Sequence, residues 1–137
     1  MKVHPTNYHD TFIVVADDCP TVMGEVPPRK GDIKSVANIQ YDILSENPYR
    51  YTSDDVLFQV YAERNDLTEN ELEEAREQFF SKGQPCFRAS PLTKRYGWGI
   101  HNNKDGKIAL FGHGTKEYEM FSGDKSLKIV KAMKSKK

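Results

Sequence analysis

The residue types best suited to chemistry gather between Phe79 and His101, where a thiol, basic side chains, hydroxyls and an imidazole surround Gly97 and Gly99. In an extended strand, Arg95 and His101 would share one face with the two glycines, because side chains alternate. Glycine at such a face allows a ligand or another backbone to come close. The opposite face would carry apolar side chains that we expect in the core, with the tryptophan largely buried: Tyr96, Trp98 and Ile100.

The basic residues of this stretch predict a site for a small anion. Arg88, Lys94 and Arg95 flank Ser90-Pro91-Leu92, a turn that folds the two segments toward each other. Guanidinium and ammonium groups are the usual partners of carboxylate and phosphate. The competing interpretation is that these charges pair with acids and only hold the domain together. The predicted site adds a hydroxyl, an imidazole and two acids: Arg88, Ser90, Lys94, Arg95, His101, Asp54 and Asp55.

Two other functions remain open. A nucleophilic cysteine needs a base and a positive setting, so Cys86 or His101 would serve a small enzyme. The alternative is that Cys86 is a buried, inert residue, which is the commoner role for a cysteine. The third function is single-stranded nucleic-acid binding, because the basic and aromatic run 94–100 is of the kind on which bases stack. A formal net charge of zero argues against nucleic acid.

Composition narrows the setting. With 137 residues, 37% of them hydrophobic, the chain is predicted to form a single domain over 1–137. The two cysteines, Cys19 and Cys86, are too few for a disulfide scaffold, and we expect both to be free. The absence of a long apolar run and of an N-terminal signal predicts a cytoplasmic protein with no membrane partner. The four histidines lack metal-site spacing, and we expect neither metal nor cofactor.

The first half predicts one strand and several helices. Thr11–Ala16 is β-branched and apolar and predicts a buried strand. Apolar residues from Ile33 to Leu44 recur at helical spacing, with Asp32 as the expected cap. Thr68 and Glu71 form the capping box of a helix that runs to about Phe80. The run 56–62 fits a helix or a strand.

The second half predicts a sheet. Cys86–Ala89 is expected to form a short strand, and 95–101 and 107–111 flank a strong turn signal, which indicates a β-hairpin. Thr115 is the expected cap of a short helix. The apolar residues between Leu127 and Met133 group on one helical face with lysines opposite, which predicts a terminal helix. The lysine-rich end either only keeps the protein soluble or binds the phosphates of nucleic acid or of a membrane.

These elements predict an α+β fold in which an antiparallel sheet, with a β-hairpin near 95–111, is packed by several helices. Helices followed by a hairpin and a terminal helix resemble small frataxin-like domains in element order. That likeness concerns fold and implies no function.

Several longer motifs resemble a family of small, mostly bacterial proteins whose domain has no known function. The motifs are 7–8 (Asn-Tyr) followed by 11–13 (Thr-Phe-Ile), 47–49 (Asn-Pro-Tyr), 51–55 (Tyr-Thr-Ser-Asp-Asp), 80–86 (Phe-Ser-Lys-Gly-Gln-Pro-Cys) and 88–99. The likeness extends over nearly the whole chain and implies one domain without a fused catalytic partner. The family brings no activity, ligand or catalytic residue. From the basic residues between Arg88 and His101 we expect a binding domain for a small anionic ligand or a protein partner.

Overall fold

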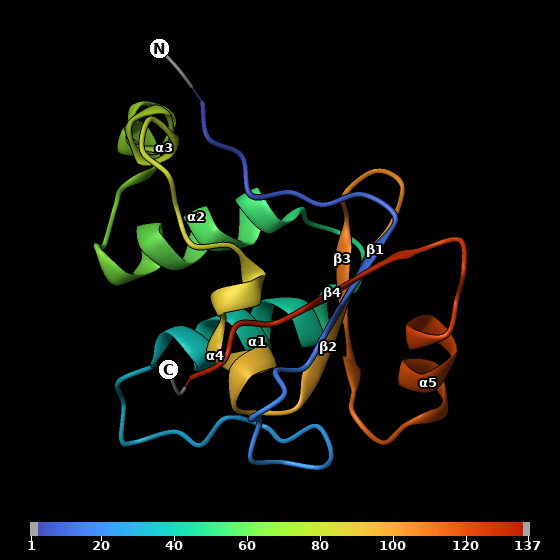
Figure 1. Cartoon of the computed structure of the whole chain (residues 1–137). Helices are drawn as coiled ribbons and strands as arrows, with labels where there is room; N and C mark the ends of the chain where they lie inside the picture. Colours follow the sequence, from blue (N-terminus) through green and yellow to red (C-terminus); the bar gives the residue numbers. More distant parts are fainter. Residues whose placement is uncertain (1–2, 136–137) are drawn as a thin grey trace.

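The computed structural model describes residues 3–135 and has an α+β fold. A mixed, mostly antiparallel sheet has most of the helices on one side and α5 (Lys116–Ser122) on the other (Figure 1). The strand order is β3-β2-β1-β4. The strands are β1 (Thr11–Val14), β2 (Trp98–Asn102), β3 (Ile108–Gly112) and β4 (Lys128–Lys131).

The predicted hairpin is confirmed as β2 and β3, which pair antiparallel with Ile100 opposite Leu110. The Asn103 side chain organises the turn by accepting hydrogen bonds from the backbone N–H groups of Asp105 and Lys107, both at 2.9 Å. Gly106 has a φ of +79°, which glycine adopts without strain.

The predicted terminal helix is wrong, because that segment is the strand β4. It pairs parallel with β1, with Phe12 opposite Ile129 and Val14 opposite Lys131. A short run of apolar and lysine residues fits either period, and the open edge of β1 decides for the strand. The likeness to frataxin-like domains depended on a terminal helix and so loses its basis.

Three longer helices form the larger layer. Ser35, rather than Asp32, caps α1 (Val36–Glu46) in a capping box with Asn38. Thr52 caps α2 (Ser53–Arg64), so the ambiguous run 56–62 is helical. Thr68 and Glu71 form the predicted capping box at the start of a 3₁₀ turn (η1, Glu69–Glu71), and this turn leads into α3 (Leu72–Phe80).

The segment between α3 and the hairpin is helical in short pieces. Phe87–Ala89 is a 3₁₀ turn (η2), so the predicted strand at Cys86–Ala89 is wrong. Ser90 then caps α4 (Pro91–Lys94), which has proline at its first position. Two consecutive turns leave no run long enough for strand pairing.

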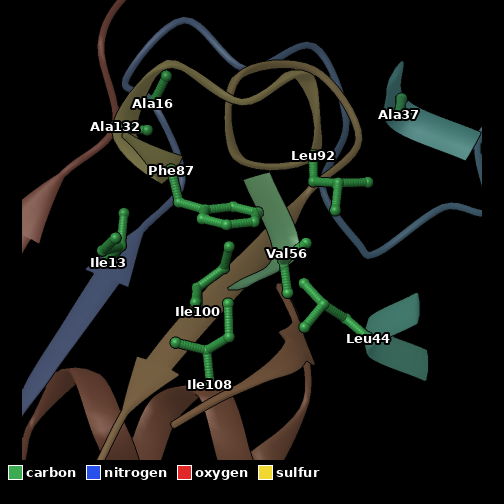
Figure 2. Close-up of a cluster of buried hydrophobic side chains, with 10 residues drawn as sticks. All are labelled: Ile13, Ala16, Ala37, Leu44, Val56, Phe87, Leu92, Ile100, Ile108 and Ala132. Carbon is green, nitrogen blue, oxygen red and sulfur yellow. The ribbon is translucent and has the colours of Figure 1, made fainter. Parts of the chain in front are cut away.

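The main core lies between the sheet and α1, α2, η2 and α4 (Figure 2). Its side chains come from the sheet, from the helices and from the segment 87–92, which places Phe87 in the middle of the cluster (Figure 2). The buried members are Ile13, Ala16, Ala37, Leu44, Val56, Phe87, Leu92, Ile100, Ile108 and Ala132.

The helix α5 (Lys116–Ser122), capped by Thr115 as predicted, covers the other face of the sheet. There Phe12 packs edge-on against Tyr118, with ring centroids 5.2 Å apart. A Cβ at Gly99 would lie 2.6 Å from Phe12 Cζ and 2.7 Å from Tyr118 Cε2. The space beside Gly99 is thus filled by the rings of Phe12 and Tyr118, and none is left there for a ligand.

Candidate functional site

The acids of the predicted site hold the N-terminal segment and α3 to the start of α2. Asp54 accepts hydrogen bonds from the backbone N–H and the hydroxyl of Thr6, both at 2.7 Å. Asp55 pairs with Arg76 at 2.9 Å. Burial acts to raise the pKa of Asp55, but hydrogen bonds from Thr52 and the Arg76 guanidinium outweigh burial and hold it below its usual value.

The basic residues of the predicted site differ in their contacts. Arg88 donates from Nε to the carbonyl of Lys131 at 2.7 Å and so fastens η2 to β4. Lys94 and Arg95 lie at the end of α4, and within residues 3–135 neither side chain has a hydrogen bond or an ion pair. The predicted strand over 95–101 begins only at Trp98 because Gly97 has a φ of +77°, so Arg95 does not share a sheet face with His101.

His101 lies on the α5 face of the sheet. Its ring stacks on Phe121, with centroids 4.2 Å apart, and its Nδ1 is hydrogen-bonded to the Tyr49 hydroxyl at 2.8 Å. Tyr49 has a φ of +60°, a strained conformation for a bulky residue. Burial lowers the pKa of His101 below its usual value, opposed by the charges of Asp10 and Asp124.

The lowered pKa of His101 predicts a pH effect on stability. In the unfolded chain this histidine takes up a proton near pH 6.5, whereas in the folded protein it stays neutral down to a lower pH. The free energy of unfolding should therefore fall as the pH drops through about 6.5. In His101→Gln this part of the pH dependence should disappear, as measured by urea unfolding at several pH values. An NMR titration midpoint for His101 at or above about 6.5 would contradict the prediction.

A large cleft lies on the other side of the molecule, between α1, α2, α3 and the segment 84–91. It has a volume of about 640 Å³, within the usual range for small-molecule sites. Its walls are mostly apolar or aromatic. The lining residues are Val36, Gln40, Leu57, Val60, Tyr61, Arg64, Asn65, Phe79, Gln84, Pro85, Cys86, Ala89, Ser90 and Pro91.

Two features of the cleft carry charge or reactivity. Arg64, in the last turn of α2, is the one charged residue among the described residues that line it. Cys86 lies in the wall formed by the segment 84–91, with its Sγ 3.6 Å from the Tyr8 hydroxyl. Burial and the neighbouring Cys86 raise the pKa of Tyr8, while the Arg88 guanidinium opposes that rise.

The comparisons with known proteins give one result. A family model, described as a family of unknown function (DUF6157), matches residues 3–137. The chain belongs to this family. No curated protein and no solved structure matches the chain significantly. The resemblance inferred from the motifs is confirmed, and the site of this DUF6157 member must be argued from its own geometry.

Of the predicted site residues in this DUF6157 chain, only Ser90 lines the cleft. The structure adds Gln40 and Arg64, which the sequence analysis missed. A signal for Gln40 was present, because it falls four residues after Val36 and four before Leu44, on the apolar stripe of α1. Arg64 carried no such signal, since a basic residue in the last turn of a helix is common.

Proposed function

We propose that this protein is a binding domain for a small ligand with an apolar body and a negative charge, held in the cleft between α1, α2, α3 and the segment 84–91. The observation that carries the proposal is the lining of this cleft. Apolar and aromatic walls with a few polar groups are typical of small-molecule sites. Both cysteines are free thiols, which supports a reducing, cytoplasmic setting as part of the proposal.

The sign of the ligand charge is argued from Arg64. No aspartate or glutamate is among the described lining residues. Within residues 3–135 the Arg64 side chain has no ion pair, whereas Arg29 and Arg76 each have one. A guanidinium without a carboxylate partner at the rim of an apolar cleft favours an anion over a cation.

The proposal predicts that Arg64→Gln weakens binding of an anionic apolar probe. Anilinonaphthalene sulfonate combines an aromatic body with one sulfonate, and its fluorescence rises in an apolar site. An exposed charge pair contributes up to about 1 kcal/mol, so the Kd should rise about five-fold. Uncharged phenylnaphthylamine should bind equally well to the wild type and to Arg64→Gln.

The matched control is Arg95→Gln, which removes an exposed and unpaired guanidinium that does not line the cleft. Its affinity for the sulfonate should equal that of the wild type, and unfolding curves should confirm that both variants are folded. Equal weakening by both variants would mean that only overall charge matters, and would contradict a site at Arg64.

An enzyme remains the second candidate because Cys86 lines the same cleft beside the Tyr8 hydroxyl. His101 does not assist it, since that ring packs on α5 at the other face of the sheet. The stacking needed for nucleic-acid binding gains no support. Tyr96 and Trp98 are half-buried, less than the sequence predicted, and both pack against the core. The centroids of the Trp98 and Tyr41 rings are 5.5 Å apart, and Trp98 Nε1 donates to the Glu25 carbonyl at 2.8 Å.

A further inference from the structure

The cleft contains a buried amide whose orientation is fixed by its neighbours. Gln40 projects from α1 and is only 2% exposed. Its Oε1 accepts a hydrogen bond from Ser90 Oγ at 2.5 Å. The pair joins α1 to the segment 84–91 across fifty positions of the chain.

Ser90 decides which end of the Gln40 amide faces it. Its Oγ accepts the backbone N–H of Leu92 at 3.1 Å as the cap of α4. The hydroxyl proton is left to donate, and the amide oxygen of Gln40 accepts it. This donation holds Oε1 toward Ser90 and leaves Nε2, with its two N–H donors, on the other side.

The Nε2 of Gln40 has no hydrogen-bond partner within residues 3–135. In the same part of the chain, His113 Nδ1 is the one buried side-chain atom closed off from solvent without a partner. Gln40 Nε2 is not such an atom, so it is not closed off from solvent. The open space that Gln40 lines is the cleft. A nearly buried amide with unused donors is costly unless a ligand or solvent accepts from it.

We propose that Gln40 Nε2 donates to an acceptor oxygen of the cleft ligand, and that Ser90 makes the site reject ligands that offer only donors at this point. The inference depends on the proposed function and extends it to a ligand class. The class comprises apolar molecules that carry a carbonyl or carboxylate oxygen at their buried part. Ser90 is here a positioning residue, because it acts through Gln40.

Three probes with a similar phenyl body test this inference: benzylacetone, a neutral ketone; phenylbutanoate, an anion; and phenylbutylamine, a cation with donors only. Binding is measured by NMR, from shifts of cleft residues such as Leu57 and Val60. The wild type should bind the ketone and the carboxylate more tightly than the amine. Gln40→Met, of similar size, should lose about five- to tenfold affinity for the ketone.

Arg64→Gln is the matched comparison, because it should weaken phenylbutanoate and leave benzylacetone unchanged. In Ser90→Ala the Gln40 amide is free to turn over, so the preference for ketone over amine should shrink. That variant also loses a helix cap, so its folded fraction is measured before binding is compared.

The outcomes separate the two proposals. If no probe shifts the cleft residues of the wild type, the proposed function fails. If the wild type binds the probes but Gln40→Met binds benzylacetone just as tightly, the inference about Gln40 is wrong and the proposed function stands. Full retention of the ketone preference in Ser90→Ala would overturn the positioning role of Ser90.

Discussion

Gly97→Ala should lower the free energy of unfolding by about 2–4 kcal/mol. Gly97 has a φ of +77°, a conformation that side chains other than glycine's adopt at a cost of about 1 kcal/mol. The added Cβ would also collide with the Met23 carbonyl oxygen and with Thr21 Oγ1. Backbone cannot move aside as a flexible side chain does, so the collision adds about 1–3 kcal/mol of overpacking.

Gly31→Ala is the matched control for this substitution. Gly31 has a similar φ of +65°, but a Cβ there would meet nothing within 4 Å. The control should therefore lose only the conformational part, about 1 kcal/mol, in the same urea unfolding measurement. Equal losses for the two variants would show that the contact with the loop at Thr21 and Met23 has no energetic weight.

Gly97 also explains why the sequence predicted the position of the hairpin better than its first strand. The turn between β2 and β3 depends on local chemistry, since Asn103 and Gly106 hold it within a few residues. The start of β2 depends instead on a loop more than seventy positions earlier, which occupies the space beside Gly97. Periodicity in one segment carries no information about such a distant contact.

The same distinction applies to the helices and to β4. Capping chemistry is local, and Thr68 and Thr115 each cap the element predicted for them. The segment Lys128–Lys131 has no comparable local signal, and its conformation is fixed by pairing with β1. An apolar and lysine-rich run of this length suits a helix face or an edge strand equally well.

The site was harder to predict than the fold, for a physical reason. Charged residues stand out in a sequence, yet Asp54 and Asp55 are used to hold Thr6 and Arg76. The cleft is made by residues from three helices and one irregular segment, most of them apolar. The role proposed for Gln40 depends on its hydrogen bond to Ser90, which lies fifty positions away in the sequence.

The wall of the cleft formed by the segment 84–91 depends on one anchor, and Phe87→Ala should therefore affect both stability and binding. Phe87 is 1% exposed and lies in the centre of the main core, between Cys86 and the Arg88 link to β4. Truncating a buried phenylalanine to alanine costs about 3–5 kcal/mol, because apolar contacts are lost and a cavity remains. Urea unfolding should show this loss.

Phe87→Leu separates anchoring from gross unfolding, since it keeps most of the apolar volume and should cost far less than the alanine variant. Met120→Ala, at a side chain that is 73% exposed, should leave the free energy of unfolding nearly unchanged. Phe87 does not itself line the cleft, whereas Cys86 and Ala89 do. If folded Phe87→Leu protein binds the sulfonate more weakly, the cause is therefore a displacement of Cys86 and Ala89. A Phe87→Ala variant as stable as the wild type would mean that the helices α1 and α2 alone hold this wall in place.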